Sequence, residues 1–110
     1  MAYNEELAGR IRKQLARRRG ITEKAMFGGL SFLLDGRMCC GVLKDTLVVR
    51  IDPKDADMLL KKPHVEPMNF TGRVMKGFLF VQAGAYKTDA QLSGWVERTL
   101  AFVSALPKKK

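Results

Sequence analysis

The segment from Met26 to Met38 constrains the fold more than any other part of this chain. A glycine pair, Gly28-Gly29, separates two apolar runs there, and Asp35-Gly36 follows. Because glycine has no Cβ, the pair allows a positive φ or the close passage of another backbone. Asp-Gly between alternating apolar residues is a strong signal for a two-residue hairpin turn. The segment therefore predicts backbone geometry: a bend between a first helix and a first hairpin. It contains no nucleophile, metal-ligand set or phosphate-binding loop.

Short runs of β-forming residues follow the glycine pair. Tight turns at Asp35-Gly36 and Lys44-Asp45 separate the first three of them, and a later pair has Gly72 or Gly77 as its turn. The expected strands are Leu30–Leu34, Met38–Leu43, Thr46–Ile51, and then a second pair within Met68–Met75 and Phe78–Val81.

A helix is expected before these strands, because apolar residues recur at every fourth position from Tyr3 to Leu15. Asn4 is its predicted N-cap, and the helix is expected to extend to Arg19 and stop at Gly20. The basic side chains lie on the flanks of the apolar stripe. This helix should therefore pack on one side and expose cations on the other.

Two more helices are indicated by their caps. Asp52-Pro53 predicts an N-cap followed by proline in the first turn, for a short helix that reaches about Leu60 before Pro63. The segment from Thr88 to Gln91 has the form of a capping box, so the final helix starts there and closes at Pro107.

The resulting order, α-β(3)-α-β(2)-α, lacks the strand–helix alternation of a parallel sheet. It predicts an α+β fold of two layers, in which an antiparallel five-stranded sheet carries helices on one face. A chain of 110 residues fits a single domain, expected over residues 1–107, with residues 108–110 as a basic tail.

The formal net charge of +9 is unevenly distributed. Residues 10–24 hold seven basic side chains and one acidic one, and the chain ends in three lysines. No apolar run approaches the ~18 residues of a membrane-spanning helix, and the first residues do not resemble a signal peptide. We therefore expect a cytoplasmic protein without a membrane partner.

The basic residues of the first helix could bind nucleic-acid phosphates or an acidic protein. The alternative is an ordinary solvated helix face, and the absence of an adjoining second helix excludes a helix-turn-helix. The candidate residues are Arg10, Arg12, Lys13, Arg17, Arg18 and Arg19.

A second candidate site is a cluster that could hold an anion or small ligand if the strands brought its members to one edge. The alternative is that the glycines only make turns and that the cations only protect a sheet edge from pairing. The candidate residues are Arg50, His64, Arg73 and Lys76.

The adjacent cysteines, Cys39 and Cys40, should point to opposite faces of a strand, so that one thiol is buried and the other partly exposed. Either could pair with His64 as nucleophile and base, but a lone histidine is more often structural. We expect no catalytic residue, and no metal, cofactor or small-molecule substrate is inferred.

Several motifs in the chain together resemble the TfoX N-terminal domain family. They are Met26-Phe27-Gly28-Gly29, Asp35-Gly36-Arg37-Met38, Leu47-Val48-Val49-Arg50, Pro63-His64-Val65, Met68-Asn69-Phe70-Thr71-Gly72-Arg73 and Met75-Lys76-Gly77, followed by a helix with Trp95. The resemblance implies an α-β(3)-α-β(2)-α fold similar to secretion chaperones and a structural role for Met26, Phe27, Gly28, Gly29, Gly36 and Gly72. It supplies no agreed catalytic residues.

The founding TfoX/Sxy regulators of this family promote natural competence together with the cyclic-AMP receptor protein, and they carry a second, C-terminal domain that we do not expect in this chain. The resemblance and the absence of a catalytic set favour a non-enzymatic binding or regulatory module. Its partner would be another protein or a second copy, docked on the sheet face or edge. The alternative is a nucleic-acid-associated factor that uses its basic first helix.

Overall fold

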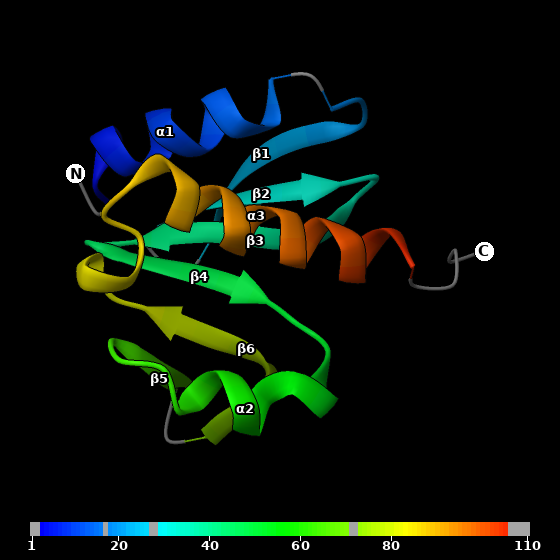
Figure 1. The fold of residues 1–110 in the computed structure, drawn as a ribbon. Helices are drawn as coiled ribbons and strands as arrows, with labels where there is room; N and C mark the ends of the chain where they lie inside the picture. The colour runs from blue at the N-terminus through cyan, green and yellow to red at the C-terminus, as the bar shows by residue number, and fades with distance from the viewer. Residues whose placement is uncertain (1–2, 17, 27–28, 71–72, 106–110) are drawn as a thin grey trace.

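The computed structural model describes residues 3–16, 18–26, 29–70 and 73–105, with the backbone alone for residues 26, 68–70 and 73–76 (Figure 1). One six-stranded antiparallel sheet has the order β1-β2-β3-β4-β6-β5. The elements are α1 (Glu5–Leu15), β1 (Ile21–Met26), β2 (Gly29–Leu34), β3 (Arg37–Leu43), β4 (Thr46–Arg50), a 3-10 turn η1 (Pro53–Asp55), α2 (Ala56–Leu60), β5 (Val65–Phe70), β6 (Arg73–Val81), a 3-10 turn η2 (Ala83–Ala85) and α3 (Asp89–Ser104).

The α+β class with helices on one sheet face is confirmed, but the predicted number of five strands is wrong. The additional strand is β1, which pairs with β2 from Ile21↔Leu34 to Met26↔Gly29. It was missed because its exposed residues Thr22, Glu23 and Lys24 lack an apolar pattern, as is common for an edge strand.

This extra strand changes the role of the glycine pair. Gly29 begins β2 opposite the end of β1, so the pair belongs to the β1–β2 connection, and the expected bend between helix and hairpin is wrong. Gly28 lies outside the described residues. At Gly29 the expected close passage of a backbone is confirmed, because a Cβ there would collide with the carbonyl oxygen of Val42.

Helix α1 starts as predicted and ends earlier than predicted. The Asn4 side chain accepts a hydrogen bond from the N–H of Leu7, at 3.1 Å, and so caps the helix. The helix ends at Leu15 instead of Arg19. The next position of the buried stripe would be Arg19, which is exposed, so no apolar contact holds another turn on the sheet.

The second strand pair is divided differently from the prediction. The segment Met68–Met75 is not one strand, since it contains the end of β5 and the start of β6, which meet at Phe70↔Arg73. Gly72 lies outside the described residues, and Gly77 is inside β6, where its carbonyl accepts a bond from the N–H of Ile51 at 2.8 Å. Pro67 is tolerated in β5 because β5 is an edge strand, where a residue without an N–H need not break the hydrogen-bond ladder.

The predicted turn and caps are confirmed. Asp35 and Gly36 both have positive φ, 52° and 83°, as a two-residue hairpin of this type requires. Thr88 and Gln91 form the complete capping box of α3, and Asp52 caps the turn that leads into α2.

All three helices lie on one face of the sheet (Figure 1). Helix α1 packs beside α3 over the middle strands, and α2 covers β5 and β6. Buried side chains between the two layers form one continuous core. None of the helices in the described part of the chain has the length and apolar character that crossing a membrane needs.

Candidate functional site

The candidate cation Arg10 is used to hold the domain together. Its guanidinium donates to the carbonyl oxygens of Tyr86 and Lys87, at 3.0 and 3.1 Å, and lies 5.9 Å from the Tyr86 ring centre. It also approaches Asp89 at 3.4 Å. Arg10 therefore fastens α1 to the segment that leads into α3.

Two more of the six basic candidates are bound within the domain. Arg12 makes a two-pronged ion pair with Glu23 of β1, at 2.7 and 2.8 Å, and Arg18 pairs with Glu97 of α3 at 3.2 Å. The hydrogen bond from Arg12 is the main cause that lowers the pKa of Glu23. Arg17 lies outside the described residues. Lys13 and Arg19 are exposed and, in the described part of the chain, make no ion pair.

Two members of the second candidate cluster, Arg50 and His64, can be placed, and they lie far apart on the sheet. Arg50 lies between the rings of Phe78 and Phe102, 5.8 and 5.9 Å from their centres, and links β6 to the end of α3. Arg50 pairs with Phe78, whereas His64 is exposed and its carbonyl bonds to Gln82, just after the end of β6. Phe78 and Gln82 are four residues apart, so about 13 Å of extended chain separates the two places. The side chains of Arg73 and Lys76 lie outside the described ones.

The expectation for the two cysteines is wrong, since both are completely buried. The strand pairing jumps from Phe32↔Cys40 to Leu33↔Met38, so Cys39 is the extra residue of a β-bulge. A bulge redirects the side chain that it carries. Both thiols therefore face the helices, and the Cys39 thiol donates to the carbonyl of Phe32 at 3.3 Å.

The structure also separates the cysteines from the histidine. Cys40 lies on β3, and His64 immediately precedes β5, which is the third strand from β3 in the sheet. The backbones of the two residues are therefore at least about 14 Å apart. The hydrogen bond with Cys39, together with burial, raises the pKa of the Cys40 thiol well above its ordinary value. A nucleophile–base pair is thus not assembled from these side chains. Among the described residues no three histidine, cysteine or carboxylate groups gather to hold a metal ion.

The face of the sheet opposite the helices carries an apolar stripe, which we call the open face. Val48 is only 4% exposed, yet it is not part of the core between the layers. Its neighbour across β6 is Phe80, and Gly41 lies opposite it on β3. By strand alternation, the half-buried side chains of Leu33, Met38 and Leu43 share this face.

One row of paired residues crosses the open face from edge to edge. Its inner residues are uncharged, whereas its ends are charged: Lys24 on β1 and Glu66 on β5. Both end residues are exposed. The complete row, in register, is Lys24, Ser31, Gly41, Val48, Phe80 and Glu66.

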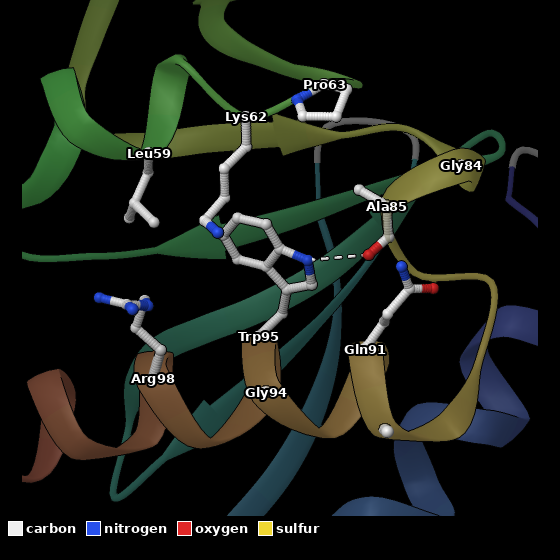
Figure 2. Close-up of a pocket in the computed structure, with 10 residues that line it drawn as sticks. Leu59, Lys62, Pro63, Gly84, Ala85, Gln91, Gly94, Trp95 and Arg98 are labelled. Atoms are coloured by element: carbon white, nitrogen blue, oxygen red, sulfur yellow. Dashed lines mark hydrogen bonds between the residues drawn. The ribbon is translucent and has the colours of Figure 1, made fainter.

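A pocket of about 390 Å³ lies on the other side of the sheet, between α2 and α3 (Figure 2). The indole of Trp95 is in this pocket and donates to the carbonyl of Ala85 at 3.0 Å. Lys62, which follows α2, points toward the indole, and Arg98 extends from α3. No sequence pattern links residues so far apart in the chain.

Comparison with protein families identifies one match. The model of the TfoX N-terminal domain family matches residues 13–103 of the 110-residue chain. The matched segment includes part of α1, the whole sheet and nearly all of α3. A search of curated proteins and a search of solved structures each found no match.

Proposed function

The chain belongs to the TfoX N-terminal domain family, and we propose that it works there as a non-enzymatic binding module that docks a protein chain on its open face. The observation that carries this proposal is the apolar stripe around Val48 and Phe80, on the sheet face where the described residues place no helix. Apolar centres with polar rims are typical of protein–protein interfaces. A link to transcriptional or competence regulation would pass through the docked protein.

A second copy of the chain fits the open face by charge. The row of paired residues carries Lys24 at one end and Glu66 at the other. When two such rows pack in antiparallel orientation around a two-fold axis, each lysine faces the glutamate of the other copy. Val48 then faces Gly41, and Phe80 faces Ser31, so each large apolar side chain meets a small residue. The same surface would therefore complement itself.

Sedimentation velocity over a range of concentrations tests this proposal. We expect reversible self-association of the wild type, weakened by Phe80→Glu because a carboxylate would be buried against apolar side chains. Lys24→Glu should also weaken it through like charges at the rim. The double variant Lys24→Glu/Glu66→Lys should restore it, since the charges again match.

The matched control is Lys61→Gln, which changes an exposed lysine beside α2, on the side of the sheet that carries the helices. It should associate like the wild type. If the wild type stays monomeric at every concentration, the second copy is excluded. The proposal then requires a different protein, whose capture from lysate Phe80→Glu abolishes and Lys61→Gln preserves. Equal capture by both variants would refute docking on the open face.

A further inference from the structure

The pocket between α2 and α3 presents hydrogen-bond donors around an apolar floor. Lys62 is exposed and, within the described part of the chain, makes no ion pair. Arg98 has one loose contact, 3.7 Å from Asp55, which leaves most of its five N–H groups available. Gln91 uses its side-chain oxygen to accept the N–H of Thr88 at 3.0 Å, so its NH₂ group remains.

One backbone acceptor of this pocket is already bound, and the carboxylates lie beyond its lining. The carbonyl of Ala85 is taken by the indole of Trp95. The nearby carboxylates line an adjoining hollow of about 590 Å³ toward the other end of α3, which shares Gly94 and Arg98 with the pocket. They are Asp52, Asp55 and Glu97. The side chains of the first pocket thus offer positive charge and donors, with no carboxylate among them.

The apolar part of the pocket suits a flat molecule. Leu59 and Pro63 stand on one wall, Ala85 at the end and the indole of Trp95 in the centre (Figure 2). Trp95 is only 8% exposed and the flexible Lys62 side chain lies toward its indole, so an aromatic ring that enters would displace that side chain and stack in its place. The volume of about 390 Å³ lies within the usual range of small-molecule sites, roughly 300 to 1,000 Å³.

From this arrangement we infer that the pocket binds a small planar organic anion, an aromatic carboxylate being its simplest form. The ring would lie on Trp95, and the carboxylate would reach Lys62 and Arg98. The site is on the helix side of the sheet and does not depend on docking at the open face.

Trp95 provides a direct reporter, because it is the only tryptophan of the chain. In a proton–nitrogen correlation spectrum its indole N–H gives a single cross-peak. We expect saturable displacement of this peak during titration with 2-naphthoate. The neutral analogue 2-naphthalenemethanol should bind at least several-fold more weakly. Added salt should weaken the binding of 2-naphthoate and leave that of the alcohol unchanged.

Variants separate the pocket from other sites of adsorption. Lys62→Gln and Arg98→Gln should each lower the affinity for 2-naphthoate about two- to fivefold, as expected for partly exposed charge pairs. Lys61→Gln is the matched control, since Lys61 does not line the pocket and should leave the affinity unchanged.

Gly94 allows the pocket to be filled without harming the fold. It lies within α3 and lines the pocket, and a Cβ there would meet nothing within 4 Å. Gly94→Leu should raise the thermal unfolding midpoint because leucine favours helix, and it should abolish binding of 2-naphthoate. Gly94→Ala should raise the midpoint while most of the affinity remains.

Three results would overturn the inference. The first is an indole cross-peak that does not move at millimolar 2-naphthoate. The second is equal affinity for the carboxylate and the alcohol, which would reduce the site to an apolar surface. The third is unchanged binding in Gly94→Leu, which would place the anion elsewhere.

Discussion

The hydroxyl of Thr99 on α3 donates a hydrogen bond to the carbonyl oxygen of Cys39 on β3. The same hydroxyl accepts the backbone N–H of Arg50, on β4, at 3.2 Å. Pairing of β3 with β4 runs from Leu43↔Thr46 to Cys40↔Val49 and stops where Cys39 and Arg50 would follow. Thr99 therefore completes the ladder at the bulge, and its side chain is completely buried.

Replacement of Thr99 by valine should destabilise the fold by about 2 kcal/mol or more, because a buried N–H and a buried carbonyl both lose their partner. Thr99→Ser keeps the hydroxyl and should cost about 1 kcal/mol for the lost methyl group. Urea unfolding followed by circular dichroism measures both values. An equal loss of unfolding free energy in Thr99→Val and Thr99→Ser would show that the hydroxyl does not bridge the strands.

Both thiols of the bulge should be unreactive in the folded protein. Cys39 and Cys40 are fully buried, so a reagent reaches neither sulfur, although the hydrogen bond with Cys40 lowers the pKa of Cys39 and raises that of Cys40. We expect an aromatic disulfide reagent to titrate no thiol in native buffer and two in urea. Rapid reaction of one thiol without denaturant would instead support the alternating arrangement, in which only one cysteine faces the core.

Arg10 should matter for stability, in contrast to its neighbour Lys13. Arg10→Ala removes charged hydrogen bonds to two carbonyl oxygens and the contact with the Tyr86 ring. The expected cost is about 1.5 to 3 kcal/mol. Lys13→Ala serves as the control and should change stability by less than about 0.5 kcal/mol. If Lys13→Ala is as costly as Arg10→Ala, the fastening role assigned to Arg10 is incorrect.

Tyr86 should make stability depend on alkaline pH. Burial, together with the negative charge of Asp45, raises the pKa of Tyr86 above its ordinary value of 10.0. The unfolded chain ionises this phenol first, so the contribution of Tyr86 to stability is complete below about pH 10 and declines as the pH rises through the folded pKa.

The variant Tyr86→Phe measures this contribution. In the wild type the Tyr86 hydroxyl donates to the carbonyl of Asp45, so the Tyr86→Phe protein should be less stable by about 1 kcal/mol at neutral pH. The difference between the two proteins in urea unfolding should shrink above about pH 10. A constant difference across the alkaline range would mean that Tyr86 has the same pKa in the folded and unfolded chains.

How much of this protein could be predicted depends on how local each signal is. The capping box of Thr88 and Gln91 and the hairpin at Asp35-Gly36 are set by residues adjacent in sequence, and both were predicted. The bulge at Cys39 depends on Thr99, sixty positions away, so no local pattern could indicate it. Similarly, Lys62 and Arg98 line one pocket only because the sheet carries α2 and α3 on the same face.

His64 supplies the last prediction, because its backbone conformation is unfavourable for a side chain and its ring rests against Gly84. Its φ is +65°, a conformation that suits glycine, and its ring lies where a Cβ on Gly84 would be, 2.5 Å from Cδ2. His64→Gly should therefore stabilise the fold by up to about 1 kcal/mol, partly offset by the greater freedom of glycine in the unfolded chain. Chemical denaturation measures this change.

A double-mutant cycle connects the two positions. Gly84→Ala should cost about 1 kcal/mol in the wild type, because the exposed ring of His64 must swing away from the new methyl group. In the His64→Gly background the same substitution should cost almost nothing, since the ring is absent. The coupling energy from the four proteins is then about 1 kcal/mol. Additive effects would show that the imidazole does not rest on Gly84, and the cost of alanine would then come from η2 itself.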